Sequence, residues 1–228
     1  MKIIMIMRKV LFIIAFFAVV LSVNAQVKFG VKAGFNASTI SGLDVADEGE
    51  TAKVNYRPGF HVGVMAQYMM SENFGLESGL YYTALGANVK YTYDSDVSSS
   101  VDLKVSPSYL QLPVSLLYKF NVGQDLYLYP SLGLYVGYGI GGKYKFSQTY
   151  NGTEISAEED IFGKDDDGDV LFNRFDAGAT VGLNLQFNKF LIGLGYDYGL
   201  LRVNKEKAGN GEKDGYNRNI KVSVGYFF

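Results

Sequence analysis

Cysteine and tryptophan are missing from the 228-residue chain, and histidine occurs only once, as His61. Without cysteine the protein has no disulfides, no thiolate metal site and no cysteine nucleophile. One histidine also excludes a metal site made only of imidazoles within a single chain. Proline is scarce as well, with four residues, whereas tyrosine (18), phenylalanine (16) and glycine (27) are abundant. The composition therefore removes thiol chemistry and imidazole-only metal sites from the functions to be considered.

The first 25 residues have the features of a secretory signal peptide. Basic residues flank a short apolar run from Val10 to Val20, and small residues precede a predicted cleavage site after Ala25. An uncleaved anchor is the alternative, but the run is short for the roughly 20 residues that a membrane-spanning helix needs. No cysteine follows the cleavage site, which excludes a bacterial lipoprotein anchor. We therefore predict an exported protein whose mature domain covers residues 26–228.

The predicted mature chain has a net negative charge. Residues 1–25 contain three basic and no acidic side chains, so their removal changes 21 basic against 23 acidic residues to 18 against 23. The resulting net charge of about −5 argues against nucleic acid as a partner, because such binding depends on basic patches.

The stretch from Arg174 to Arg202 shows the clearest structural pattern. Apolar residues occupy every second position from Phe175 to Phe187, and the residues between them are mostly polar or glycine. The pattern resumes after the two-residue link at 188–189. A repeat of two predicts strands, and a two-residue link predicts a tight hairpin. Each strand is longer than the roughly five or six residues usual in a soluble sheet and long enough to cross a bilayer at a tilt.

Six further stretches alternate in the same way. They cover residues 27–37, 56–70, 74–91, 110–120, 126–146 and 219–228. The long polar links are 39–55, 92–106, 147–171 and 204–215, and the short turns are 71–73, 121–124 and 188–189. Long links and short turns alternate strictly, which places both termini on the side of the short turns. The plan predicts an all-β fold, an eight-stranded antiparallel up-and-down transmembrane β-barrel.

Glycine and aromatic residues indicate which face of the barrel points outward. Glycines fall repeatedly on the polar face, where small side chains make room inside a narrow eight-stranded barrel. Aromatic residues gather near both ends of the apolar face, as expected for two membrane interfaces. One group comprises Phe29, Tyr68, Phe74, Tyr118, Phe120, Phe187, Phe190 and Phe228; the other comprises Tyr56, Tyr109, Phe175, Tyr196, Tyr198 and Tyr216. We expect the apolar face to contact lipid, with a secreted soluble ligand-binding barrel as the alternative.

Two prolines lie inside predicted strands. Pro113 and Pro130 each remove one hydrogen-bond donor from a strand ladder. We therefore expect local bulges or interrupted pairing at both positions.

Three segments resemble a known family. They are residues 27–36 (VKFGVKAGFN), residues 109–120, which begin YLQLPV, and the C-terminal GYFF at 225–228. These segments are similar to the outer-membrane β-barrel proteins of Bacteroidetes, often called the PorT or porin-like family, and the resemblance extends over the mature chain. It implies that Pro113 is a normal feature of the fourth strand and that Phe228 is the signal read by the barrel-assembly machinery. Components of type IX secretion are one role known in that family.

The polar face carries charges of both signs. They are Lys28, Lys32, His61, Glu77, Lys119, Arg174, Asp176, Asp197 and Lys221. Because buried charges must be paired, we expect an internal ion-pair network that fills the lumen. Eight strands leave an interior just wide enough for side chains, which excludes a wide diffusion channel but leaves a narrow conductance as an alternative.

Two features of the sequence resemble parts of a functional site, one of a catalytic site and one of a calcium site, but each lacks residues that such a site needs. His61 points inward on the alternation and no serine stands in a nucleophile motif, so we predict that the protein is not an enzyme. Asp165, Asp167 and Asp169 have the alternate spacing of a calcium loop, but the loop lacks the glycine at its sixth and the glutamate at its twelfth position. Calcium is therefore a weak candidate, and we expect no other cofactor.

The sequence thus predicts a monomeric integral protein of the bacterial outer membrane with a structural or surface-interaction role. The expected partners are outer-membrane lipids and the barrel-assembly machinery. A surface ligand and secretion components are further candidates, and a narrow channel or a type IX-like secretion component is the alternative function.

Overall fold

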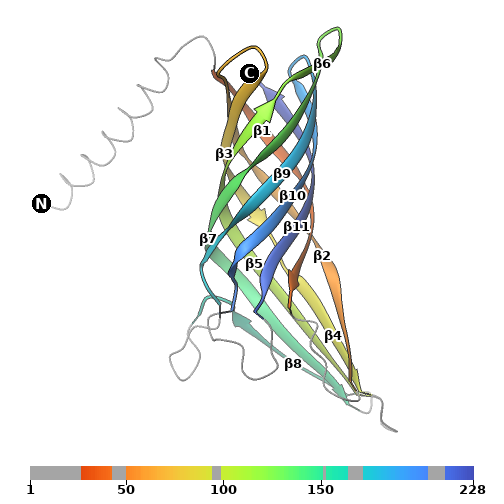
Figure 1. The fold of residues 1–228 in the computed structure, drawn as a ribbon. Coiled ribbons are helices and arrows are strands. Elements are labelled where there is room, and N and C mark those ends of the chain that lie inside the picture. The colour runs from red at the N-terminus through yellow and green to blue at the C-terminus, as the bar shows by residue number, and fades with distance from the viewer. Residues whose placement is uncertain (1–26, 43–49, 94–98, 151–152, 164–171, 205–213) are drawn as a thin grey trace, which may run out of the picture.

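The computed structural model describes residues 27–42, 50–93, 99–150, 153–163, 172–204 and 214–228. Within these ranges it consists of tilted antiparallel strands (Figure 1). The strands are β1 (Val27–Ser41), β2 (Glu50–Met69), β3 (Phe74–Ala84), β4 (Ala87–Tyr93), β5 (Ser99–Tyr118), β6 (Phe120–Gly123), β7 (Leu126–Tyr150), β8 (Thr153–Asp160), β9 (Phe175–Phe187), β10 (Phe190–Arg202) and β11 (Tyr216–Phe227). None of the described residues forms a helix long and apolar enough to cross a membrane.

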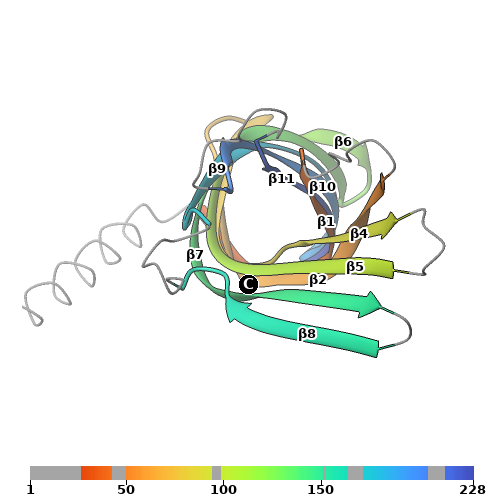
Figure 2. The ribbon, with the colours of Figure 1, turned by 90° about the horizontal axis from the view of Figure 1, so that it is seen from below.

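The strands close into a ring, which is visible along the axis in Figure 2. Each long strand pairs with its neighbours in the chain, and β11 pairs back onto β1 from Gly30–Phe227 to Ser41–Tyr216. The segments β3 and β4 are two parts of one strand, because both pair with β2 and β5. Strand β6 likewise continues β5 along β7. The predicted eight-stranded antiparallel up-and-down barrel is confirmed.

The two strand prolines interrupt pairing, each on one side only. On the side of β3, the ladder skips Pro113 between the pairs Ser78–Val114 and Tyr81–Gln111. Pro113 nevertheless keeps its place opposite β7. Pro130 pairs with β9 in the same way, while its other edge faces the gap that separates β5 from β6. Interrupted pairing is thus confirmed. The register is the same on both sides of each gap, because proline removes one backbone hydrogen-bond donor and adds no residue to the strand.

Irregular backbone occurs at other positions: one register shift, between Asn121 and Gly123, lies at a short turn, and the others lie on the side of the long links. A register shift between Ser108 and Tyr109 displaces β5 against β7. The strand that contains β3 and β4 breaks at Leu85 and Gly86, where Leu85 N donates to Pro107 O at 2.9 Å. Gly86 has a φ of 149°, a conformation that side chains rarely adopt. The sequence analysis treated 74–91 as one unbroken strand and missed this break.

The apolar face points outward, as predicted. Leu134 is 65% exposed, whereas Asp197 on the polar face is 2% exposed. Exposed apolar side chains alternate along every long strand, among them Val62, Val64, Leu112, Val114, Leu183, Leu194 and Val222. The inward face is buried and polar, and its glycines make room: a Cβ on Gly178 would lie 2.7 Å from the ring of Tyr135. The alternative of a soluble ligand-binding barrel requires apolar side chains inside and polar side chains outside, and the structure contradicts it.

Strands extend further than predicted on the side of the long links. Strand pairing continues to Tyr93–Ser99 between β4 and β5, and β7 pairs with β8 from Lys143–Asp160 to Tyr150–Thr153. These hairpins project beyond the ring (Figures 1 and 2). The prediction of polar links at 92–106 and 147–171 is therefore wrong for residues 92–93, 99–106, 147–150 and 153–160, which lie in strands.

One aromatic residue was placed on the wrong face. Tyr109 was predicted in an outward interface group, but it is 2% exposed and its ring lies 6.1 Å from that of Phe162 inside the barrel. Its position next to the outward-facing Leu110 already requires an inward side chain, because neighbours in a strand point to opposite faces.

Candidate functional site

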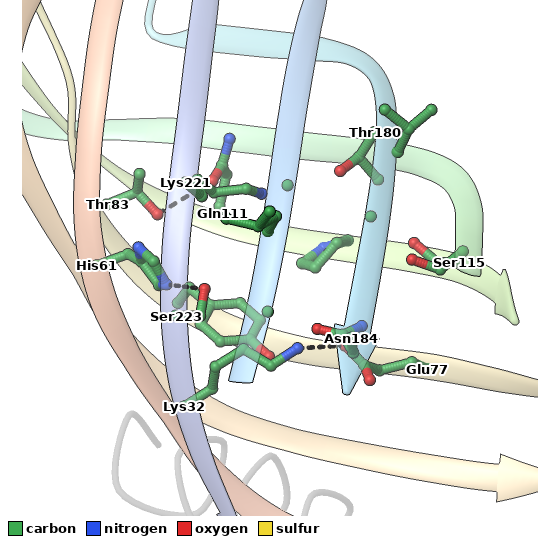
Figure 3. Close-up of a pocket in the computed structure, with 18 residues that line it drawn as sticks. Lys32, His61, Glu77, Thr83, Gln111, Ser115, Thr180, Asn184, Lys221 and Ser223 are labelled. Atoms are coloured by element: carbon green, nitrogen blue, oxygen red, sulfur yellow. Dashed lines mark hydrogen bonds and ion pairs between the residues drawn. The ribbon is translucent and has the colours of Figure 1, made fainter. Parts of the chain in front are cut away.

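The lumen contains a polar cavity of about 70 Å³ near the middle of the barrel (Figure 3). Side chains from strands around the ring line it, including Lys32, His61, Glu77, Thr83, Gln111 and Lys221. The volume suffices for a few waters and not for an organic substrate. The polar lining of the cavity is the candidate site of the protein.

One ion pair crosses the lumen between β1 and β3. Lys32 Nζ lies 2.6 Å from Glu77 Oε1, and the two side chains are 10% and 15% exposed. Strand β2 separates them, and Gly63 stands opposite Lys32 on β2. The absence of a side chain there lets the lysine reach over β2. The structure therefore brings these two predicted residues together.

A second cluster surrounds Asp197 on β10. Lys221 Nζ donates to Asp197 Oδ1 at 2.6 Å, and Thr180 Oγ1 donates to the same oxygen at 2.7 Å. Asn219 Nδ2 donates to Asp197 Oδ2 at 3.3 Å. The carboxylate is thus held by one cation and two neutral donors from β9 and β11. Both carboxylate oxygens have partners, which is what a buried charge requires.

Asp176, the other predicted carboxylate of the β9–β10 hairpin, has neutral partners. Tyr135 Oη and Asn217 Nδ2 donate to its Oδ2 at 3.1 and 2.9 Å. Its Oδ1 is buried and lacks a hydrogen-bond partner among the described residues. Asp176 therefore belongs to a hydrogen-bonded group and not to an ion pair.

His61 lies in a chain of three side chains. Its Nδ1 is 2.7 Å from Asn36 Oδ1. Its Nε2 is 2.9 Å from Ser223 Oγ, and this second contact is drawn in Figure 3. The sequence analysis missed this serine, since it looked for a local motif. The barrel register would have indicated it, because Gly34 of β1 stands opposite both His61 and Ser223.

The chain of Asn36, His61 and Ser223 has the order of an orienting group, a base and a nucleophile. Two requirements for catalysis are not met by its surroundings. The adjoining cavity of about 70 Å³ leaves no room for a substrate, and Ser223 sits in the middle of β11, where strands pair on both sides. Backbone N–H groups in such ladders are not free to stabilise an oxyanion. The arrangement satisfies three buried polar groups.

Three predicted network residues lie at the ends of the lumen and form no ion pair among the described residues. Lys28 is exposed near the short turns, and Lys119 Nζ lies 4.0 Å above the ring of Tyr127 at the same end. At the opposite end, Arg174 donates to the carbonyls of Gly139 and Phe162 at 3.2 and 3.1 Å. The predicted network is therefore a set of separate clusters.

Apolar clusters lie on both sides of the polar cavity along the barrel axis. The cluster towards the short turns comprises Met65, Tyr81, Leu191 and Phe227. The cluster towards the long links comprises Ile40, Leu85, Ala87, Val105, Tyr109, Ile161, Phe162 and Val203. Ile161 and Phe162 follow β8 directly and fold back into the barrel, where Ile161 N donates to Gly142 O at 3.2 Å. Side chains therefore fill the lumen above and below the cavity.

The remaining predicted site residues are the three aspartates of the calcium-like loop and the C-terminal Phe228. Asp165, Asp167 and Asp169 lie outside the described residues, and within those no group of three or more acidic or histidine side chains is arranged for a metal. Phe228 is exposed at the end of the chain, and its backbone N donates to Phe29 O at 2.9 Å. The C-terminal aromatic thus lies on the outer surface, at the edge of the band of exposed apolar side chains around the barrel (the apolar belt).

Comparison with known proteins gives one family match and several similar structures. A family model described as an outer membrane protein β-barrel domain matches residues 23–203. The crystal structure of Ail, the attachment invasion locus protein of Yersinia pestis, is 17% identical with a TM-score of 0.40, over 90% of this chain and 100% of Ail. OprG of Pseudomonas aeruginosa is 14% identical with a TM-score of 0.38, over 90% and 96% of the two chains. Neisserial surface protein A is 14% identical with a TM-score of 0.39, over 88% and 97%. Curated protein sequences gave no significant match.

Proposed function

The chain belongs to the outer membrane protein β-barrel domain family, and on this premise we propose that it is a non-enzymatic barrel that anchors a surface-exposed β-structure in the bacterial outer membrane. The observation that carries the proposal is the filled lumen, where paired polar side chains lie between two apolar clusters. The projecting β4–β5 and β7–β8 hairpins supply the surface for contacts with other molecules. The finer assignment to the porin-like family of Bacteroidetes rests on the three segments at 27–36, 109–120 and 225–228.

Planar-bilayer recording of the purified barrel tests this proposal. We expect no large steady conductance, because Phe162 and its neighbours occupy the outer end of the lumen. A wide, permanently open pore would contradict the filled-lumen assignment. Heat-modifiable migration on a gel, a property of folded outer-membrane barrels, serves as the check that the recorded protein is folded.

A narrow channel is the second candidate, and the polar cavity favours it. Phe162→Ala removes the largest side chain that projects from the segment after β8 into the outer end of the barrel. If the cavity is one part of a gated path, Phe162→Ala should raise single-channel conductance well above that of the native protein. The matched control is Phe175→Ala, which removes a 68% exposed ring from the outer surface and should leave conductance unchanged.

A serine-directed fluorophosphonate probe tests the absence of enzymatic activity. We expect no labelling of the folded barrel, because Ser223 adjoins a cavity too small to admit the probe. Labelling that is lost in Ser223→Ala and His61→Ala would contradict the proposal and would identify the Asn36–His61–Ser223 chain as a reactive site. The unfolded protein, in which the chain of hydrogen bonds does not exist, provides the background level.

A further inference from the structure

A basic cleft lies on the outer face of the barrel, at the end that carries the long links. It has a volume of about 520 Å³ and is lined by residues of β2, β3, β5, β7 and β8. Four cationic side chains line it, namely Arg57, Lys104, Lys143 and Lys145, whereas Glu158 is the one carboxylate among the lining residues. The cleft is thus strongly basic, although the chain as a whole is acidic.

The cleft begins where the apolar belt ends. Along the outward face of β5, the exposed residues Leu112 and Leu110 are followed by Ser108, Ser106 and Lys104. Strand β7 carries its own lysines at the same level, because Ser106 pairs with Lys143 and Lys104 with Lys145. In an outer-membrane barrel this is the boundary between hydrocarbon and headgroups, where the phosphates of the outer leaflet lie.

Two lysines in the cleft face each other across the β5–β7 ladder. Lys104 and Lys145 are direct cross-strand partners, an arrangement that is destabilising for like charges. Neither forms an ion pair with any residue that the structure describes. Glu158 stands opposite Lys145 and acts on it electrostatically, but its carboxylate forms its ion pair with Lys143, so one carboxylate is shared among three lysines of the cleft. An anion bound between the two lysines would remove the repulsion.

The wall of the cleft nearer to the apolar belt is aromatic. Phe60 and Tyr82 also line it, with ring centroids 5.4 Å apart, and Phe60 is 48% exposed. Tyr82 Oη is 2.8 Å from Ser108 Oγ, which fixes the ring against β5. A ligand for this cleft therefore carries an anionic group at one end and an apolar group at the other.

We propose that the cleft binds the phosphate group of a phosphorylated glycolipid in the outer leaflet of the outer membrane. The phosphate lies between Lys104 and Lys145, with Arg57 and Lys143 beside it, and an acyl chain runs along Phe60 and Tyr82. Phosphate matches the cations in charge and in hydrogen-bond capacity. This site lies on the lipid-facing surface, so it is independent of whether the lumen conducts.

The test compares lipid binding by the folded native protein and by the double variant Lys104→Gln/Lys145→Gln. Each barrel is placed in nanodiscs, and retention of bis-phosphorylated lipid A is measured against its dephosphorylated form. We expect the native protein to prefer the phosphorylated lipid and the variant to lose about tenfold or more in affinity, since two of the four cations that line the cleft are removed. The loss should shrink as salt is raised.

The control is Lys28→Gln/Lys119→Gln, which removes the same charge at the opposite end of the barrel. It should leave lipid binding unchanged, and heat-modifiable migration should show that both variants fold. Equal binding of the two lipid forms, or equal loss in the two double variants, would overturn the proposal. Inorganic phosphate should compete only weakly, because it lacks the acyl chain; competition as strong as that of the lipid would overturn the assignment to a lipid.

Discussion

Leu183→Arg is expected to impair insertion of the barrel into the membrane and to lower its stability by about 2–4 kcal/mol. Leu183 is 44% exposed on the outward face of β9 and pairs with Leu194 and Pro130, so its side chain lies in the apolar belt. An arginine at this position would place its charged guanidinium in the hydrocarbon of the bilayer or distort the bilayer to keep that group hydrated. The measurement is the folded fraction in lipid vesicles across a urea titration, read from heat-modifiable gel migration.

The matched control for this substitution is Ile155→Arg. Ile155 is 69% exposed on β8, a strand that projects beyond the ring, so an arginine at this position stays in water. Ile155→Arg should fold as the native protein does. If the two variants fold equally well, Leu183 does not contact hydrocarbon and the outward belt is not the membrane surface.

Asp197→Ala is expected to destabilise the barrel by about 3–5 kcal/mol, because it leaves Lys221 as an uncompensated charge in the lumen. The substitution also removes the acceptor for Thr180 and Asn219. The side chain of Asp197 is 3% exposed, so water cannot replace the carboxylate without rearrangement. The free energy of unfolding from a urea titration in vesicles measures the effect.

Two further variants separate loss of the charge pair from loss of packing. Asp197→Leu combined with Lys221→Met removes both charges and should recover much of the lost stability, since a buried pair replaced by apolar groups is often neutral. Glu158→Ala breaks the exposed pair with Lys143 and should have no measurable effect. If Asp197→Ala is as mild as Glu158→Ala, the Asp197 cluster does not stabilise the fold.

The strand hairpins beyond the membrane show a limit of sequence patterns. Alternation is visible where one face meets lipid and the other meets the lumen, as it is from Phe175 to Phe187. In β8 the described side chains are exposed on both faces. Neither face then requires apolar residues, so β8 and the outer ends of β5 and β7 read as polar links although they are paired strands.

The lumen clusters show a different limit. Alternation places Lys32, Glu77, Asp197 and Lys221 on the inward face, and the structure agrees. It does not say which of them meet, and it placed Asp176 among the ion pairs although its partners are neutral. Those contacts join residues on different strands, and alternation within one strand carries no information about how two strands are aligned.

The sequence by itself determined the number of strands, the closed antiparallel plan, the outward direction of the apolar face and the inward direction of the charges. The strand number and the plan follow from the period of two within a strand and from the alternation of long and short connections. The directions of the two faces follow from the glycines on the polar face and the aromatic residues at the ends of the apolar face; all of these are local properties of the chain. Only the tertiary structure decided the ion pairs, the contact of His61 with Ser223, the apolar clusters and the cleft between Lys104 and Lys145. These depend on strand register and on the closure of β11 onto β1, which bring together residues far apart in the chain, such as His61 and Ser223, which are 162 positions apart.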